Sequence, residues 1–391
     1  MKLLVLAQIP PPAHGQGIMV QTLVEGLGEV AGEHRAGERV EVHHVNLGLS
    51  RDAGDIGRAR AGKLFALWLA CLRALWRRAR IGGRVTLYYV PAPAKRAALY
   101  RDWMAMCLLR PFFSNLVLHW HASGLGEWLA TRATAPERWL TRLFLGRAAL
   151  SIVLAPELAG DARALGARRV CVVANGVDAG ADVPTASRIG KNFPQAQAVG
   201  TPASTSLLFL GACTREKGLF AALDALSILE RENPGEFFLT IAGAFADIGE
   251  ERVFLERIAD DAALRRCVKY AGPADEARKH ALYAGADIFV FPTRYAHEAQ
   301  PLVLIEALAH DLPIVTTRWR AIPGMLPCDA RARLVEHDAP APELAGAIRA
   351  VRAAGAANGV LRAHYEARFT RQAHLRALAG ALVEAGRREP T

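Results

Sequence analysis

The sequence contains few cysteines, and they follow no recognisable pattern. Its six cysteines lie far apart, with no Cys-x-x-Cys pair and no histidine at metal-ligand spacing. Disulfide frameworks and zinc sites depend on such pairs, so neither is supported. We expect free, buried thiols in a reducing compartment.

Long apolar runs are also absent. No uncharged apolar segment approaches the roughly 20 residues that a membrane-spanning helix requires. The opening MKLLVLAQIPPP has a lysine before an apolar run, but that run covers only residues 3–7 and no small-residue cleavage site follows. Residues 2–7 are therefore predicted to form a buried parallel strand, and the protein is expected to stay in the cytoplasm.

Acidic residues are scarce in the N-terminal half. The chain of 391 residues has a formal net charge of +10, of which residues 1–185 contribute +9. Residues 58–110 contain 12 basic residues and a single acid, Asp102. This imbalance predicts an acidic partner for the N-terminal half. A nucleic acid is not the expected partner, because no recognisable nucleic-acid-binding module with exposed aromatics is present.

Residues 58–84 have the pattern of an amphipathic helix. A broad apolar arc carries two tryptophans, and a narrow basic stripe includes Arg73, Arg77 and Arg80. Such a helix is typical of proteins that lie on an anionic lipid surface. A helix packed in its own domain with a solvated basic edge has the same pattern, and both interpretations remain open. Residues 95–113 again combine apolar and aromatic residues with basic ones.

A complete dinucleotide-binding fingerprint is missing as well. The first predicted strand leads through Gly15-x-Gly17 into a helical pattern, which is the order that opens a Rossmann-like half. Val20 occupies the position of the third glycine, so a nicotinamide site is disfavoured. The glycines form either a loop over another ligand or a tight turn without one.

Two carboxylates flank a predicted helix start in residues 286–313. A strand leads into a loop that carries Glu298, Pro301 is expected to open the helix, and Glu306 lies about one and a half turns further on. Amides at a helix start bind anions. The unit suits a nucleotide-diphosphate sugar, although a loop acid and a solvated helix acid would have the same spacing. The expected anion site consists of Ala299, Gln300, Pro301, Leu302 and Val303.

Two further loops follow predicted strands. Arg215 and Lys217, after the strand at 206–210, form either a diphosphate clamp or a solvated basic loop. His119 and His121 follow another strand and are expected to lie on the same side. His119 is also compatible with a core position. A third metal ligand is missing within sequence reach, so no metal site is expected.

Together these segments resemble the retaining glycosyltransferases of family 4, also called group 1. The resemblance rests on Glu298 and Glu306 with seven residues between them, on Lys217-Gly218, and on the Asn-Gly-Val-Asp turn that ends at Asp178. It implies an α/β GT-B fold with two Rossmann-like domains that face each other across a cleft. The implied bounds are an acceptor domain at 1–182, a linker at 183–205, a donor domain at 206–366 and a returning helix at 367–391.

The resemblance also implies the chemistry. Glu306 would hold the ribose and Glu298 the sugar hydroxyls, while Lys217 and Arg215 would meet the diphosphate. His121, with His119 as the alternative, would lie near the transferred sugar, below the glycine loop. Neither a metal nor a cofactor is implied. Three positions depart from the family pattern, which usually has arginine, glycine and glutamate where this chain has Ala212, Asp311 and Gly324.

The resemblance implies a transferase that moves a sugar from a nucleotide-diphosphate sugar to a glycan, with retention of configuration. The basic region at 58–110 favours a lipid-linked acceptor in surface polysaccharide assembly, and a peripheral position at the inner face of the cell membrane. Another GT-B enzyme, such as a nucleotide-sugar 2-epimerase, and a non-catalytic nucleotide-sugar-binding protein remain the alternatives.

Overall fold

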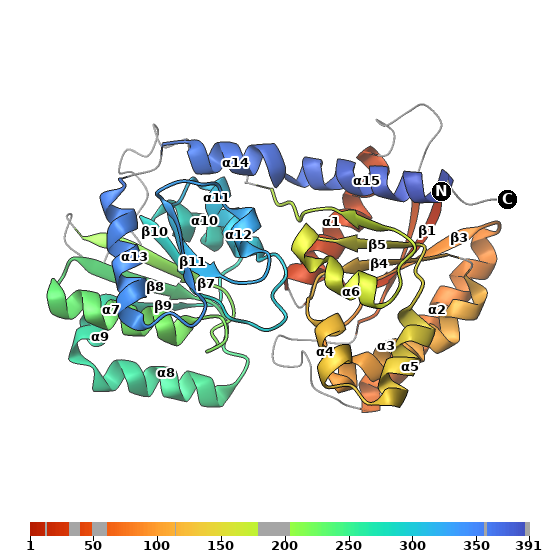
Figure 1. Ribbon diagram of the computed structural model, residues 1–391, viewed down its shortest axis with the longest axis horizontal. Coiled ribbons are helices and arrows are strands. Elements are labelled where there is room, and N and C mark those ends of the chain that lie inside the picture. Colours follow the sequence, from red (N-terminus) through yellow and green to blue (C-terminus); the bar gives the residue numbers. More distant parts are fainter. Residues whose placement is uncertain are drawn as a thin grey trace. The chain divides into compact units, whose positions relative to one another are not determined.

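The chain forms two compact units (Figure 1). Unit 1 comprises Met1–Gly176, Ala296–Gln300 and Arg371–Thr391, and unit 2 comprises Val177–Tyr295 and Pro301–Thr370. Residues 183–203 of the predicted linker and residues 58–60 of the predicted basic helix lie outside the described residues. The computed structural model describes residues 1–11, 14–30, 40–48, 61–113, 115–178, 204–355 and 358–387.

Unit 1 is built on a sheet of six parallel strands in the order β2-β1-β3-β4-β5-β6. Residues 3–7 of the central strand β1 are fully buried, because helices cover both faces of a parallel sheet. This confirms the strand predicted at 2–7. The strands are β1 Lys2–Ala7, β2 Glu41–Asn46, β3 Val85–Tyr89, β4 Asn115–Trp120, β5 Leu150–Val153 and β6 Val170–Val172.

The helices of unit 1 include one from the far end of the sequence. Leu378 and Leu382 of α15 join the buried cluster around β1 and α1. The close approach of α15 to α1 depends on Gly26, because a Cβ atom there would lie 2.5 Å from Leu375. The helices are α1 Gly15–Val30, α2 Ala61–Ile81, α3 Arg96–Leu109, η2 Arg110–Phe112, α4 Leu125–Thr131, α5 Ala135–Leu145, η3 Pro156–Leu158, α6 Ala159–Ala164 and α15 Arg371–Arg387.

Unit 2 has a second parallel sheet in the order β12-β11-β10-β7-β8-β9. Read from β9, this is the doubly wound order 3-2-1-4-5-6, so the crevice for a ligand lies where β7 and β10 meet. The strands are β7 Thr205–Leu210, β8 Phe237–Ala242, β9 Val268–Gly272, β10 Ile288–Phe291, β11 Ile314–Arg318 and β12 Ala332–Glu336. The helices are α7 Leu219–Glu232, α8 Ile248–Asp260, α9 Ala262–Cys267, α10 Glu276–Ala284, α11 Leu302–Ala309, α12 Ile322–Met325, α13 Ala341–Ala353 and α14 Val360–Arg368.

The basic helix predicted at 58–84 corresponds to α2, which ends at Ile81. Gly82 and Gly83 follow with φ of 64° and 66°, the left-handed conformation that commonly terminates helices. No helix in the described part of the chain is both long and apolar enough to cross a membrane.

Two apolar faces on α2 have different environments. Leu67, Ala70, Cys71 and Ala74 are buried against unit 1. A second stripe points outward and recurs every four residues, which places its members one above another on a helix. Its side chains are 41–55% exposed, and adjacent Phe65 is 61% exposed. The outward stripe consists of Leu64, Trp68, Leu72 and Trp76.

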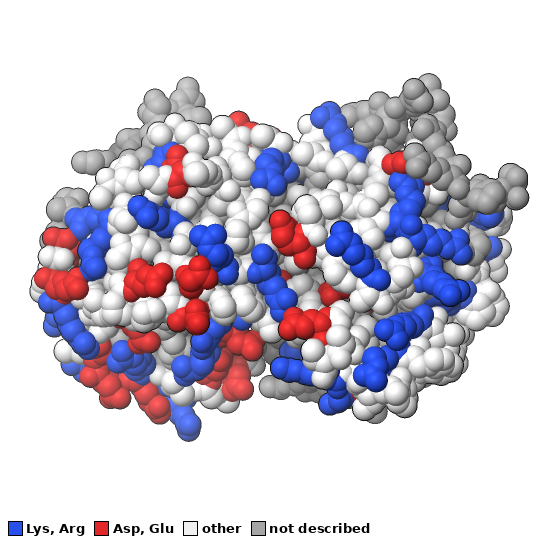
Figure 2. All heavy atoms as spheres, viewed as in Figure 1, with Lys and Arg blue, Asp and Glu red and all other residues white. Residues whose placement is uncertain are grey.

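The surface around α2 is basic. The only acid of residues 58–110, Asp102, is buried, where it accepts hydrogen bonds from the Tyr89 hydroxyl (2.8 Å) and the Ala92 amide (2.7 Å). Figure 2 shows Lys and Arg side chains gathered over the part of unit 1 where Figure 1 labels α2 and α3. Among the described residues, Arg96 and Arg101 of α3 pair with Glu137 and Asp102, whereas Arg73, Arg77 and Arg80 of α2 have no ion pair with a carboxylate.

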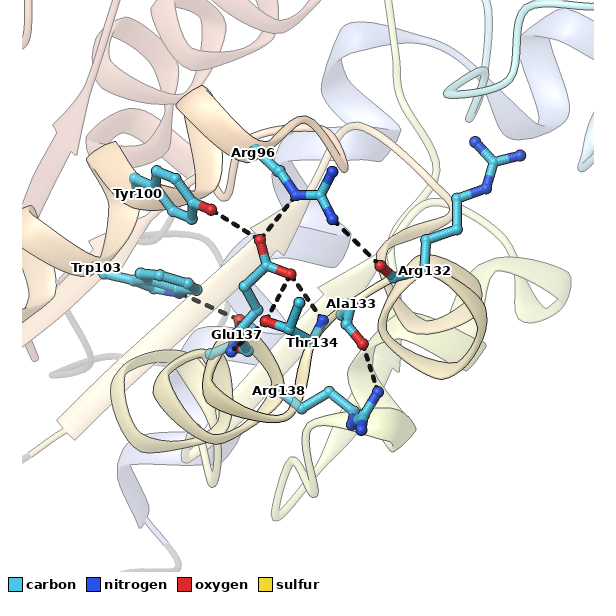
Figure 3. Close-up of polar contacts among 9 residues, drawn as sticks. Arg96, Tyr100, Trp103, Arg132, Ala133, Thr134, Glu137 and Arg138 are labelled. Carbon is cyan, nitrogen blue, oxygen red and sulfur yellow. Dashed lines mark hydrogen bonds and ion pairs between the residues drawn. The ribbon is translucent and has the colours of Figure 1, made fainter.

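Helices α3 and α5 are joined by a polar network around Glu137 (Figure 3). The Glu137 carboxylate accepts hydrogen bonds from Arg96 Nε (2.8 Å) and the Tyr100 hydroxyl (2.7 Å). It also accepts from the Thr134 amide (2.7 Å), which completes a capping box at the start of α5. Hydrogen bonds from Arg96 and Thr134 hold the pKa of Glu137 at about 2. Glu137 therefore stays ionised at mildly acidic pH and keeps the hydrogen bonds that join α3 and α5.

Candidate active site

The loop after β7 carries Lys217 to the crevice of unit 2. Gly218 follows with φ of 89°, and a Cβ atom there would lie 2.2 Å from the carbonyl oxygen of Pro292. Only glycine fits this approach. The Lys217 ammonium lies 4.7 Å from the ring centroid of Tyr295 and 5.7 Å from that of Phe291. The cation is thus positioned where β7 and β10 end, the expected place for a ligand in a doubly wound sheet.

Arg215 lies over a different ring from Lys217. Its guanidinium is 4.3 Å from the ring centroid of Phe220 on α7, and its side chain is exposed. It lines a pocket of about 200 Å³ between α7, α13 and the carboxyl ends of β10, β11 and β12. The other charged residues of this pocket, which sequence patterns did not indicate, are Asp224, Arg294, Glu336 and Asp338.

Glu306 lies in the second turn of α11 and has two protein partners. Its Oε1 accepts a hydrogen bond from Lys279 Nζ at 2.6 Å, and its Oε2 accepts from the Tyr283 hydroxyl at 2.9 Å. Burial disfavours the Lys279 ammonium, but the adjacent Glu306 carboxylate outweighs it and raises the pKa of Lys279. Each carboxylate oxygen of Glu306 keeps a lone pair for a further donor. Glu306 is therefore fixed in orientation and still able to accept hydrogen bonds.

Sequence reasoning missed the partners of Glu306. Lys279 and Tyr283 are four residues apart on α10, so both lie on one face of that helix. This spacing predicts that the two side chains can contact the same partner. It does not identify Glu306 as the shared partner, because α10 and α11 are brought together only by the fold.

The prediction that Pro301 would open the helix is wrong in detail. Pro301 is the N-cap residue, with φ of −63° and ψ of 120°, and α11 begins at Leu302. Proline fixes φ at a value that suits both helix and extended chain, and here ψ is extended. The predicted anion site is also divided, since Ala299 and Gln300 belong to unit 1 while the next three residues belong to unit 2.

The segment Ala296–Gln300 is held by the loop after β4. The Ser123 hydroxyl donates to the Glu298 carbonyl at 2.5 Å, and the Ser123 amide donates to the His297 carbonyl at 3.3 Å. His297 Nδ1 lies 3.1 Å from the Ser123 carbonyl. Glu298 is only 6% exposed. The predicted sugar-binding carboxylate is thus part of unit 1, beside the loop that carries His121.

Gln300 connects the same segment to the Asn-Gly-Val-Asp turn. Its Oε1 accepts from the Asn175 amide at 2.6 Å, and its carbonyl accepts from Asn175 Nδ2 at 3.2 Å. Gln300 Nε2 donates to the Leu154 carbonyl at 3.4 Å. The side chain of Gln300 therefore has a structural role in unit 1 as a hydrogen-bonded link.

Four histidines meet at the carboxyl end of the unit 1 sheet. The rings of His119 and His121 lie 4.1 Å apart, as expected for the same side of a strand, and those of His119 and His374 lie 6.3 Å apart. His119 is 1% exposed and its Nδ1 forms a short hydrogen bond with the Tyr88 hydroxyl, so it is a core residue. His14, which sequence reasoning missed, accepts a hydrogen bond from the Gly17 amide at 2.9 Å.

These histidines are neutral at ordinary pH. Burial lowers the pKa of His121 to about 3 and that of His374 to about 4. The positive charge of a protonated His374 or His14 contributes, after burial, to the lowered pKa of His121. His121 can therefore donate or accept a hydrogen bond without bringing charge to the site.

The prediction that Gly15 and Gly17 form a loop or turn before the helix is wrong, because both glycines lie in the first turn of α1, directly after the loop that follows β1. This position is at the strand order switch between β1 and β3, and the neighbouring His14 links it to the histidine cluster. Among the described residues, no three His, Cys, Asp or Glu side chains are grouped so that they could hold a metal ion.

Comparison with known proteins connects the crevice of unit 2 to a family. Residues 196–352 match the family of glycosyl transferases group 1. This group 1 segment contains Lys217, Glu298 and Glu306. Glycogen synthase from Mycobacterium tuberculosis is 30% identical over 227 residues, which cover 55% of this chain and 50% of that protein. The chain thus spans about half of the length of this relative.

Solved structures extend the likeness to nearly the whole chain. Sucrose-phosphate synthase from Thermosynechococcus elongatus has a TM-score of 0.72 at 18% identity and covers 98% of both chains. The Anabaena protein HepE, solved in complex with UDP and glucose, has a TM-score of 0.67 at 17% identity and covers 98% of this chain and 100% of its own. At these identities the likeness concerns the fold. The predicted GT-B architecture of two Rossmann-like domains is confirmed.

Proposed function

We propose that this protein is a retaining, metal-independent glycosyltransferase that moves a sugar from a nucleotide-diphosphate sugar to a glycan acceptor. The observation that carries this proposal is the match to group 1 glycosyl transferases over the segment that has Lys217 at the crevice of its sheet and Glu306 held nearby by Lys279. The UDP bound by the structurally similar HepE supports a nucleotide donor.

Unit 2 provides groups suited to a nucleotide diphosphate. The Lys217 ammonium and the Arg215 guanidinium would neutralise the phosphates, and Glu306 would accept hydrogen bonds from the ribose hydroxyls. The first amides of α11, at Leu302 and Val303, lie at the positive end of the helix dipole, which favours an anion. As the bond to the sugar breaks, negative charge grows on the diphosphate, and fixed cations stabilise that charge more than the ground state. These cations could meet the charge without a metal ion.

Unit 1 provides groups suited to the sugar. Glu298 would orient the sugar hydroxyls, neutral His121 would lie near the anomeric centre or the sugar 6-position, and Gly15 and Gly17 would allow close approach of the ligand. In a same-face reaction the leaving phosphate can accept the proton of the attacking hydroxyl. No separate general base is then required.

A screen of nucleotide-sugars by thermal shift tests the donor proposal. A donor that binds the folded state at 100 times its Kd should add about 2.7 kcal/mol of stability. Product analysis then separates the alternatives, because a transferase forms a new glycosidic bond with an acceptor whereas a 2-epimerase converts the donor alone. Stabilisation without any turnover would favour a non-catalytic binding protein, and no stabilisation by any nucleotide-sugar would contradict a donor site.

We also propose that the acceptor is lipid-linked and that the protein works at the anionic inner face of the cell membrane, in surface polysaccharide assembly. The outward stripe of α2 with Phe65 supports an interfacial helix, since these side chains are exposed and, among the residues that the structure describes, no acid forms an ion pair with Arg73, Arg77 or Arg80. The Arg80 guanidinium lies 3.7 Å from the Trp76 ring centroid, a pairing of aromatic and cation that suits a headgroup region.

Reversal of Arg73, Arg77 and Arg80 to glutamate should abolish flotation with vesicles that contain anionic lipid. Each basic residue near such a surface contributes about 1 kcal/mol, so removing three and adding three acids should lower the partition coefficient at least about 100-fold. Arg163, Arg252 and Arg278 are exposed elsewhere, and their reversal is the control with equal charge change. Equal flotation of the two triple variants would contradict a specific membrane face.

A further inference from the structure

Three arginines surround a small pocket at the edge of unit 1. The pocket has a volume of about 130 Å³ and is lined by Arg110, Phe113, Leu116, Arg147, Ala149 and Arg168. None of the three guanidinium groups has an ion pair with a carboxylate among the residues that the structure describes. Three cations thus share one cavity without a counter-charge from the described chain.

Arg110 is anchored by the end of α5. Its two terminal nitrogens donate to the carbonyl oxygens of Phe144 at 2.6 Å and Gly146 at 2.7 Å. These carbonyls lie at the C-terminal end of α5, where the helix dipole favours a cation. The anchoring fixes the guanidinium at the pocket wall, so little side-chain entropy remains to be lost when a ligand binds.

The backbones of the other two arginines are held by hydrogen bonds between the loop before β5 and the loop before β6. Arg147 has φ of 54°, a left-handed conformation that is uncommon for arginine, and its amide donates to the Leu165 carbonyl at 2.9 Å. The Arg168 amide donates to the Ala148 carbonyl at 2.9 Å. Both side chains therefore start from determined positions beside the pocket and end in solvent-exposed guanidinium groups.

The cations in this cavity repel one another. Burial lowers the pKa of Arg110, and the nearby charge of Arg168 lowers it further. The unfavourable energy of the like charges of Arg110 and Arg168 is relieved when an anion enters between them. The pocket is accordingly arranged to gain energy from an anionic ligand.

The pocket lies at the amino ends of strands in unit 1, whereas the unit 1 residues of the candidate active site lie at the carboxyl ends of strands. Its residues, apart from Leu116 at the start of β4, precede the strands β4, β5 and β6, whereas Gly15, Gly17 and His121 follow strands of the same sheet. The six residues of β4 alone separate the amino and carboxyl ends of this strand by about 20 Å. A ligand in this pocket is therefore distant from the groups of unit 1 that are proposed to contact the sugar, and the inference goes beyond the proposed function.

We propose that Arg110, Arg147 and Arg168 form a binding site for a phosphate group. Planar guanidinium forks match the oxygens of phosphate and bind them by paired hydrogen bonds. The cavity is smaller than the roughly 300 Å³ from which pockets for drug-sized ligands begin, so it accepts the phosphate and not an attached nucleoside. Two exposed apolar residues lie close in the sequence to residues of this site, Phe112 two positions after Arg110 and Leu143 in the last turn of α5. The phosphate belongs either to a lipid headgroup or to a soluble phosphate.

The test compares two double variants of the full chain. Arg147→Gln with Arg168→Gln removes two charges from the pocket and keeps Arg110, which also caps α5. Arg132→Gln with Arg163→Gln removes the same charge from exposed positions of unit 1, and Figure 3 shows the Arg132 side chain directed away from the network around Glu137. Both variants retain the groups proposed for the donor, so a difference between them reports on the pocket alone.

Binding is measured with two probes at fixed ionic strength. Inorganic phosphate is titrated by calorimetry, and vesicles of neutral lipid with phosphatidic acid are compared by flotation with vesicles in which oleate supplies the same charge without phosphate. If the source is a lipid, the pocket variant should bind phosphatidic acid vesicles at least about 10-fold more weakly than the control variant and lose the preference over oleate. If the source is soluble, the same loss should be found for inorganic phosphate and not for vesicles. Equal binding of the two variants to both probes would overturn the proposal.

Discussion

Replacement of Lys217 by alanine is expected to lower the kcat of sugar transfer about 100-fold or more. The ammonium is held between Phe291 and Tyr295 at the crevice, where it would face the diphosphate as negative charge develops. Removal of one fixed charge or hydrogen-bond donor that stabilises such a transition state typically costs about 2.7–4 kcal/mol in other enzymes. The measurement is steady-state transfer with the donor that the thermal shift screen identifies.

Lys269 provides the matched control for this experiment. It lies in β9 at the edge of the same sheet, away from the crevice, and Lys269→Ala removes the same side chain. Its kcat should stay within about twofold of the wild type, and both variants should have wild-type circular dichroism. Undiminished turnover by Lys217→Ala would rule out the proposed donor site.

Acid should destabilise unit 1 between pH 6.5 and about pH 4, and His374 should account for much of the effect. This side chain is 2% exposed and lies at α15, where its Nδ1 lies 2.7 Å from the Ala174 carbonyl. Burial lowers its pKa from 6.5 to about 4 in the folded state. The folded pKa is the lower one, so its contribution to stability is complete above pH 6.5 and is lost as the pH falls to about 4. The difference corresponds to about 3 kcal/mol.

The His374→Asn variant tests this assignment, because the asparagine amide can donate to Ala174 and does not titrate. The free energy of unfolding of unit 1 can be followed by urea-dependent hydrogen exchange of amides in β1 and α15. The variant should lose less stability than the wild type between pH 6.5 and pH 4, whereas exposed His337→Asn should behave like the wild type. Identical pH profiles for all three proteins would exclude His374 as the source. His121, whose pKa is also lowered, would account for a residual slope.

The local elements of this fold can be read from the sequence with few errors. Residues 3–7 are uniformly apolar because both faces of the central strand are covered, and α7 begins at Leu219 as expected from the glycine before it. These signals are local, since period, glycine and proline act on the residues next to them. The same principle explains the error at Pro301, where φ is set by the residue but ψ by its surroundings.

The orientation of α2 is an intermediate case. The sequence identifies a broad apolar arc but does not determine which part of it faces the domain. The structure buries the side with Leu67 and Cys71 and exposes the side with Trp68 and Trp76. Four residues are a little more than one turn, so two neighbouring stripes have nearly the same periodicity. Only packing against the rest of unit 1 distinguishes them.

What the sequence by itself determined is the α/β architecture and the nature of the chemical groups, including the basic loop at Lys217, the carboxylates Glu298 and Glu306, and the histidines His119 and His121 at the end of β4. Only the tertiary structure decided their partners. In the folded chain, Glu306 accepts a hydrogen bond from Lys279, and the backbone of Glu298 bonds to Ser123 in unit 1. Three arginines from three separate segments line one pocket. The physical reason is that periodicity and turn chemistry act over a few residues, whereas a contact across up to 175 residues is encoded only in the packing of the whole unit.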